Sequence, residues 1–247
     1  MPKLKPALCQ KNKINPVRDK TPKMYVGRQR RLISNGVKGG NKMEGLKLAA
    51  SYSWNCNTAK RLKVCEKLLG FILGKAKNSQ IAKKILTTLI PYRFYSAIAK
   101  ANEISGEFSP AVVSFYWRGW PKAFKSPRPD TSFFHNHTVA AIAYSQPLNK
   151  IDLYHMNECL AACGRIKKVG KNYFIVEYQP VVRKKNGLFI GKPTETKITN
   201  HLKLKAKTGD FISFHYANAA EIISPAEAER STEITKEILQ KFNAQKK

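Results

Sequence analysis

The stretch Glu158–Ile166, ECLAACGRI, marks the point where the pattern of the sequence changes. The segment NKIDLYHMNECLAAC (149–163), which overlaps its beginning, has apolar residues at helical spacing. After Gly164 the chain breaks into short β-rich runs, RIKKV, YFIVEYQPVV, GLFIG, TETKIT and DFISFHY, which are separated by turn residues. Strands at this spacing favour a small barrel of the OB-like kind.

The pattern on either side of these runs is helical. Ser224 and Pro225 are typical of a helix start, and they open a final helix with Glu227 and Glu229 in its first turn. Residues 41–120 show helical periodicity, residues 121–134 form a Pro-rich connector, and HTVAAIAY (137–144) suggests a short apolar strand. The sequence therefore predicts an α+β protein: a helical domain (41–120), then a region (135–247) that holds a strand and helix, the barrel and a C-terminal helix.

The chain is strongly basic. Its 247 residues contain 45 Lys and Arg against 16 Asp and Glu, a formal net charge of +29. Either this charge attracts polyanions, or it is a solvated surface without a partner. Residues 1–40 form a basic arm that is expected to be disordered until it meets a partner. The nucleic-acid candidates are the basic residues of this arm and of the first barrel strand: Lys11, Lys13, Arg28, Arg30, Arg31, Lys167 and Lys168.

The cysteines indicate a reducing compartment. The chain has five cysteines, an odd number, and no apolar segment of secretory or membrane-spanning length. We therefore expect free thiols in a cytoplasmic protein that does not span a membrane.

Cysteines and histidines supply the candidate metal ligands. Cys159 is either a small buried hydrophobe or a ligand, and Cys163 would share its helical face if the helix continued through Ala162. On the strand FISFHYA, His215 lies on the face opposite the bulky residues and is expected to point out of the barrel. His135 and His137 share one side of an extended segment, which suits a metal or a phosphate. Cys56, beside aromatic residues, is either packing or a ligand.

Local signatures of common enzyme classes are missing from the sequence. It has no Gly-rich phosphate loop, no HExxH helix and no paired CxxC knuckles. A binding protein is therefore favoured over an enzyme. Aromatic residues in YFIVEY, flanked by lysines, are either barrel core or a stacking platform for nucleic-acid bases.

The C-terminal third resembles the HypC-type hydrogenase maturation chaperones. That family begins with Met-Cys-Leu-Ala, has a glycine five positions after the cysteine, forms a small barrel, and closes with a Gly-Asp signature that ends in histidine, followed by an acidic helix. The matching positions here are Cys159, Leu160, Ala161, Gly164, Gly209, Asp210, His215, Glu227 and Glu229.

This resemblance implies a function. Cys159 and His215 would hold an iron fragment, Fe(CN)2CO, during its assembly and its transfer to a hydrogenase large subunit or another maturation partner. A thiolate suits soft, cyanide-bearing iron, and a nearby imidazole would orient it or complete its ligand shell.

The whole chain also resembles a bacterial and archaeal family of unknown function that has a helical domain before a HypC-like barrel. The motif positions in that resemblance are Cys56, Trp117, His137, Cys159 and His215.

Three functional hypotheses follow. The first is a metallocentre assembly chaperone or related binding module. The second is a basic protein that binds RNA or the ribosome through its arm and its lysine-lined barrel. The third is a thiol- or metal-dependent enzyme with Cys56, His137 and His215 gathered between the domains.

Overall fold

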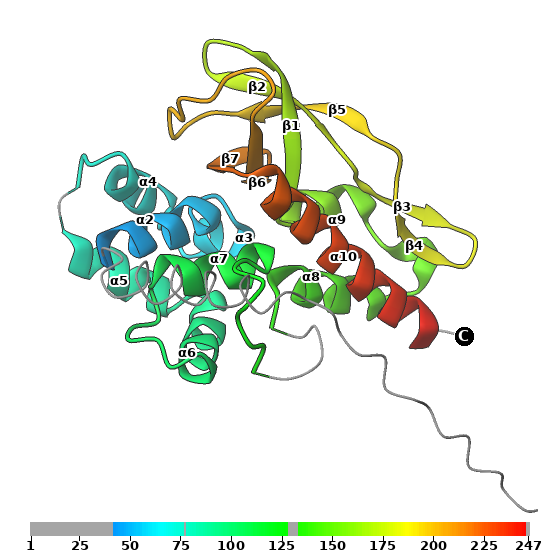
Figure 1. The fold of residues 1–247 in the computed structure, drawn as a ribbon, viewed down its shortest axis with the longest axis horizontal. Helices are drawn as coiled ribbons and strands as arrows, with labels where there is room; N and C mark the ends of the chain where they lie inside the picture. The colour runs from blue at the N-terminus through cyan, green and yellow to red at the C-terminus, as the bar shows by residue number, and fades with distance from the viewer. Residues whose placement is uncertain (1–41, 77, 128–132, 246–247) are drawn as a thin grey trace, which may run out of the picture. The chain divides into compact units, whose positions relative to one another are not determined.

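The computed structural model describes residues 42–76, 78–127 and 133–245. The basic arm predicted for residues 1–40 lies outside these ranges. Within them the protein is α+β, as the sequence predicted: helices in the N-terminal part, a closed five-stranded barrel and a C-terminal helix (Figure 1).

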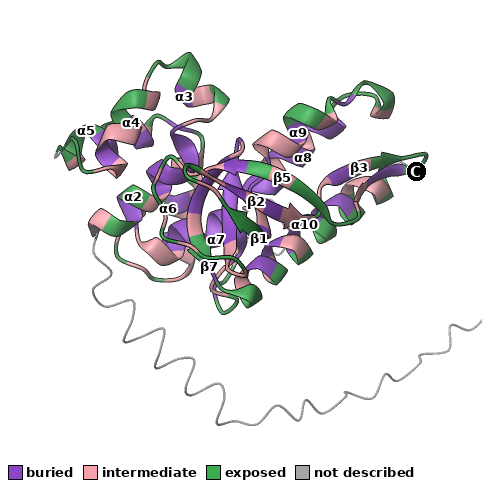
Figure 2. Cartoon of the chain, turned by 90° about the horizontal axis from the view of Figure 1, so that it is seen from above, coloured by how far each residue is buried: buried purple, intermediate pink, exposed green. Residues whose placement is uncertain are grey.

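The N-terminal part is helical. Its elements are α2 (Lys42–Ser53), α3 (Asn57–Arg61), α4 (Cys65–Ile72), α5 (Ser79–Thr87), α6 (Pro91–Ala101) and α7 (Pro110–Arg118). Helix α7 is at the centre of the packing, because every residue from Val112 to Arg118 is buried (Figure 2). Pro110 at its first turn and Gly119 in the left-handed conformation at its end set its limits.

The segment predicted as a strand, HTVAAIAY, is instead part of a helix. Helix α8 runs from His135 to Tyr144. Its buried residues fall in adjacent pairs four residues apart, beginning with His135 and Asn136, and this is helical periodicity. A short apolar run does not distinguish a strand from a buried helix, and its three alanines favour the helix. Helix η1 (Leu148–Lys150) and α9 (Leu153–Cys159) follow.

The barrel contains five of the seven strands found in the described ranges. Its strands are β1 (Ala162–Val169), β2 (Tyr173–Tyr178), β5 (Thr194–Thr199), β6 (Phe211–His215) and β7 (Asn218–Ile223), and they close in the order β1-β2-β5-β7-β6. All neighbouring pairs are antiparallel except β5 and β7. Strands β3 (Val181–Lys184) and β4 (Gly187–Ile190) pair only with each other, in a hairpin outside the barrel. Helix α10 (Pro225–Gln245) ends the chain.

Two hydrophobic clusters position the site. The barrel has its own interior, which includes Ile166, Ile212 and Phe214. The larger cluster joins the helices to the β3–β4 hairpin and α10. Both belong to one compact unit, Gly39–Lys247. The outer wall of β6, which carries Ser213 and His215, is therefore buried under the helices.

Two glycines within helices provide a test of this packing. A Cβ atom at Gly45 in α2 would lie 1.6 Å from the carbonyl oxygen of Phe108, whereas one at Gly70 in α4 would meet only Ala76, at 3.9 Å. We expect Gly70→Ala to raise the free energy of unfolding by about 0.5–1 kcal/mol, because alanine favours a helix over glycine. Gly45→Ala should lower it by about 2 kcal/mol or more, because a backbone carbonyl must move. Urea unfolding of both variants measures the difference, and equal effects would contradict the packing described here.

Candidate metal centre

A cavity of about 350 Å³ lies between the end of strand β6 and the helices. Its walls come from the α2–α3 junction, the start of α6, helices α7, α8 and α9, and the β6–β7 turn. Most of its lining is apolar or aromatic, including Ile90, Trp117, Val139, Ile142 and Met156. The polar lining includes two cysteines and three histidines, Cys56, His135, His155, Cys159 and His215.

Three of these side chains form a compact cluster. One ligand atom each from His135, Cys159 and His215 lies within 4.8 Å of the other two. His135 is the first residue of α8, Cys159 the last of α9, and His215 the last of β6. The start of α8 and the ends of α9 and β6 therefore bring three donors from distant parts of the sequence together.

Hydrogen bonds fix the orientation of both imidazole rings. The Nδ1 atom of His215 lies 2.6 Å from the carbonyl oxygen of Tyr52, and that of His135 lies 3.3 Å from the hydroxyl of Tyr116. Both Nε2 atoms lie 2.9 Å from the carbonyl oxygen of Cys159. Metal-binding histidines typically have their second nitrogen held by a carbonyl or similar group in this way.

The ring of His215 is not fully satisfied by these partners. A neutral imidazole has only one N–H, yet both nitrogens of His215 face carbonyl oxygens. If Nδ1 donates to Tyr52, the lone pair of Nε2 faces the oxygen of Cys159. A metal ion bound at Nε2 would use that lone pair, so the donor arrangement fits a metal ion.

Burial keeps the cluster neutral. Desolvation lowers the pKa of His135 to about 3 and that of His215 to about 4. Desolvation also raises the pKa of the Cys159 thiol, although a hydrogen bond from the Tyr216 hydroxyl partly opposes this shift. Both imidazoles are therefore ready to bind a metal ion at neutral pH, and the thiol would release its proton on binding.

Tyr216 is a site residue that sequence reasoning missed. It and Ala217 form the two-residue β6–β7 turn, and both have positive φ, 50° and 53°. Such conformations are costly for residues other than glycine and concentrate at functional sites. The turn brings the phenol to the Cys159 thiol. The only signal in the sequence was a tight turn without glycine between two strands.

His137 does not belong to the cluster, contrary to the prediction. The prediction assumed an extended segment, in which His135 and His137 share a side. In helix α8 two residues differ by about 200° around the axis, so the side chains diverge. The ring of His137 instead packs against Phe242 of α10, with centroids 5.2 Å apart.

Cys163 does not share a helical face with Cys159. Helix α9 ends at Cys159 and Leu160 is extended, so Cys163 lies in β1, opposite Ser213 of β6. The residue is half-buried, and desolvation of its thiol raises the pKa to about 11. A larger groove, about 780 Å³, lies between α10, the β3–β4 hairpin and the barrel. Among its described lining residues Cys163 is the only cysteine, and none is a histidine.

Cys56 lines the cavity but stands outside the compact cluster. Its sulfur accepts a hydrogen bond from the backbone N–H of Ala59 at 3.3 Å and caps α3. Desolvation raises the pKa of its thiol.

A buried ion-pair network lies behind the cluster. The guanidinium of Arg118 contacts Glu221 at 2.8 Å and Glu227 at 2.7 Å. The hydroxyl of Tyr52 donates to Glu221 and lies 2.6 Å from that of Ser213. Tyr52 thereby connects the network to His215, whose ring its carbonyl holds.

The nucleic-acid candidates are only partly within the described ranges. Lys11, Lys13, Arg28, Arg30 and Arg31 lie outside them. Lys167 and Lys168 are exposed on β1, and Lys167 lies 3.5 Å from Glu177. Among the described residues, no helix combines the length and the apolar character that crossing a bilayer requires.

The two buried histidines predict acid sensitivity of the metal-free protein. Their folded-state pKa values lie below the ordinary value of 6.5, so below about pH 6.5 the unfolded chain binds protons that the folded chain does not. Stability present above that pH is lost as the pH falls toward 4. We expect the melting temperature in a chelator to fall by about 10 °C between pH 7 and pH 5. His215→Gln should reduce this fall in melting temperature. His201→Gln, at an exposed position, should leave the fall unchanged.

Comparison of the chain with protein-family models, with curated proteins and with solved structures gave no match in any of the three. The resemblance to HypC-type chaperones therefore stays a prediction, and the functional argument depends on the geometry of the cluster.

Proposed function

We propose that this protein binds a soft transition-metal ion at His135, Cys159 and His215 and acts as a metallocentre binding module of the HypC type, with an iron fragment as its cargo. The observation that carries the proposal is the cluster itself: a thiol and two imidazoles within 4.8 Å, with both rings held at Nδ1.

The donor set narrows the class of metal. Thiolate and imidazole ligands suit iron, zinc, copper and nickel, whereas magnesium and calcium take oxygen ligands. No carboxylate belongs to the cluster. The site is therefore suited to a soft or borderline ion.

Three protein donors leave room for ligands that the metal brings with it. A site of three donors is open by at least one position, and here that position adjoins a cavity of about 350 Å³. The apolar side chains of Val139, Ile142 and Met156 line it. Small ligands such as cyanide and carbon monoxide would fit a cavity of this size, and the Tyr216 hydroxyl is nearby.

The meeting of Cys159 and His215 supports the HypC type in particular. These are the two residues that the resemblance singles out, and 56 positions separate them. In HypC-type chaperones the cysteine is next to the terminal amine, which an internal cysteine lacks. In this chain His135 is a second nitrogen donor beside Cys159.

The geometry supports binding rather than catalysis by a cysteine nucleophile. Such catalysis needs a thiolate and an adjacent base. Here burial raises the pKa of the Cys159 thiol, and the nearest ring nitrogens face its carbonyl oxygen. The grouping of Cys56, His137 and His215 expected for an enzyme does not form, because His137 packs against Phe242.

Anaerobic purification tests the proposal in two steps. Metal analysis after incubation with Fe²⁺ reports whether the site binds a metal, and we expect close to one equivalent. Infrared bands of bound cyanide and carbon monoxide, after co-expression with a hydrogenase maturation system, report whether the cargo is the iron fragment. Binding without such bands would keep the metal site and reject the HypC type, and absence of binding would reject both.

Cys159→Ala should abolish this metal binding. The variant loses the only thiolate of the cluster, and two imidazoles alone are a weak site. Cys65→Ala is the matched control, because this thiol belongs to α4 and does not line the cavity. Far-UV circular dichroism should show both variants folded. Equal metal content in wild type and Cys159→Ala would remove Cys159 from the site.

Tyr216→Phe should weaken metal binding without abolishing it. The substitution removes the hydrogen bond that favours the Cys159 thiolate, and loss of such an outer partner typically costs about 10–100-fold in affinity. Competition with a chromogenic chelator measures the change. Tyr173→Phe, on the barrel, is the control and should bind as wild type. An unchanged affinity in Tyr216→Phe would show that the phenol only packs.

A further inference from the structure

The end of the barrel formed by the β1–β2 turn and the β5–β6 connection is rich in lysine. Strands β2 and β5 are antiparallel with Tyr173 opposite Thr199, and the N–H of Asn200 donates to the carbonyl of Asn172 at 2.9 Å. These contacts bring the turn and the connection together. The exposed lysines there are Lys168, Lys171, Lys197, Lys203, Lys205 and Lys207, which we call the lysine end.

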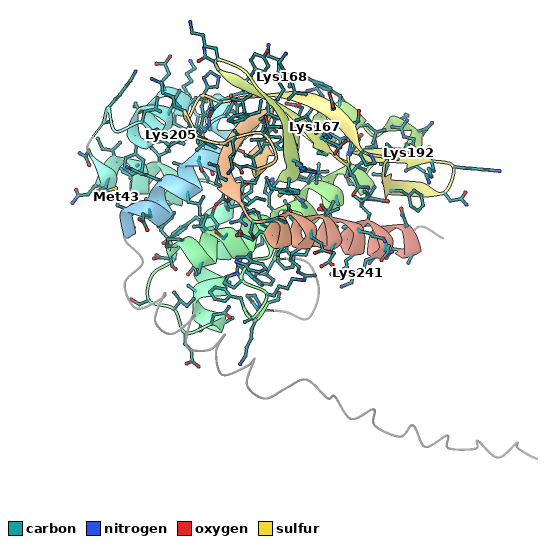
Figure 3. The ribbon with its side chains drawn as sticks, turned by 45° about the horizontal axis from the view of Figure 1, so that its top comes forward. Met43, Lys167, Lys168, Lys192, Lys205 and Lys241 are labelled. Atoms are coloured by element: carbon teal, nitrogen blue, oxygen red, sulfur yellow. The ribbon has the colours of Figure 1, made fainter. Side chains whose placement is uncertain are left out.

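The lysine end has little acidic charge among its own residues. Segments 166–176 and 196–209 contain no Asp or Glu. The nearest acidic residues in sequence lie at the margins of these segments: Glu177 is opposite Glu195 on β2 and β5 and lies 3.5 Å from Lys167, and Asp210 accepts the backbone N–H of Lys207. Figure 3 shows Lys168 and Lys205 on the barrel, whereas Lys241 lies on α10.

Three of the lysines form a row of alternate residues on a segment that packs against the barrel. Exposure alternates along 203–207, with Lys203, Lys205 and Lys207 outward. Leu204 and Ala206 between them pack against the barrel core. The side chain of Asn200 holds this segment through hydrogen bonds to the N–H and the carbonyl of Leu204, at 2.8 Å and 3.0 Å.

A phosphodiester backbone is the partner that this pattern fits. It is a polymer with one negative charge per repeat, and several cations grouped on one surface can contact successive repeats. Membrane insertion has less support, because Val169 is the only large hydrophobic residue counted as exposed among the described residues of these segments. We propose that the lysine end binds the phosphate backbone of nucleic acid, independently of the metal centre.

The aromatic residues of strand β2, which the sequence had suggested as a stacking platform, all have contacts within the protein. Phe174 is buried inside the barrel, and Tyr178 packs against Phe214 with centroids 5.2 Å apart. The ring of Tyr173 contacts Gly170 and lies 4.6 Å from the Lys197 ammonium. Binding at the lysine end is therefore independent of base sequence and strongly dependent on salt.

The test compares two charge-matched variants of the full chain. In the row variant Lys203, Lys205 and Lys207 become Gln, and in the control variant the exposed Lys67, Lys83 and Lys100 of the helical part become Gln. Both lose three positive charges and keep the basic arm. Fluorescence anisotropy with labelled poly-uridine, over a range of salt concentrations, gives the affinity and its salt dependence.

We expect the row variant to bind poly-uridine about tenfold more weakly, or more weakly still, at 0.1 M salt. The slope of log K against log salt should be smaller by about 2, because each lost phosphate contact on a single strand removes about 0.7 from it. The control should stay close to wild type. Equal losses in both variants, or none in the row variant, would overturn the proposal. A loss with phosphatidylserine vesicles but not with poly-uridine would also overturn it. Duplex DNA in place of poly-uridine tells which nucleic acid is preferred.

Discussion

The carbonyl oxygen of Cys159 is the point at which the helices and the barrel wall are joined. It ends α9, and the last carbonyls of a helix lack partners within that helix. Here the ring nitrogens of His135 from α8 and His215 from β6 both lie 2.9 Å from it. The same residue places its thiol beside those rings. Because one residue supplies both the backbone contact and the sulfur, the packing of the two layers and the geometry of the donors are fixed together.

The ion-pair network of Arg118 stabilises the same interface between the helices and the barrel wall. A buried guanidinium is costly unless its partners are in place, and Arg118 is satisfied by Glu221 of β7 and Glu227 of α10. Losing either carboxylate would leave this buried charge with a single ionic partner. Tyr52 ties the network to the site, since its hydroxyl contacts Glu221 while its carbonyl holds His215. The barrel wall therefore has little freedom to slide against α2 and α7, and this preorganises the donors.

The sequence predicted the barrel and the outward direction of His215, because both follow from the two-residue periodicity of strands. It did not predict that His215 is buried, since that depends on which surface covers the strand. Helix α8 shows a different kind of limit. The apolar run from His137 to Tyr144 had no periodicity that excluded a strand. Predicting a strand placed His135 on the same side as His137, which does not belong to the cluster. The position of Tyr216 at the site could not be predicted, because it depends on a left-handed turn conformation that the neighbouring residue types do not indicate.

The net charge of +29 bears on what the metal centre can receive. A strongly positive protein slows the approach of free divalent cations and favours neutral or anionic species. The charge of Lys60 adds to this effect near the site. It also lowers the pKa of His215, although burial is the larger cause. Ferrous iron that carries two cyanides and one carbon monoxide has no net charge, so this field does not repel it. On the proposed function, the positive charge therefore speeds the arrival of a neutral, ligand-bearing cargo relative to the bare ion, while the donors of the cluster still bind either one.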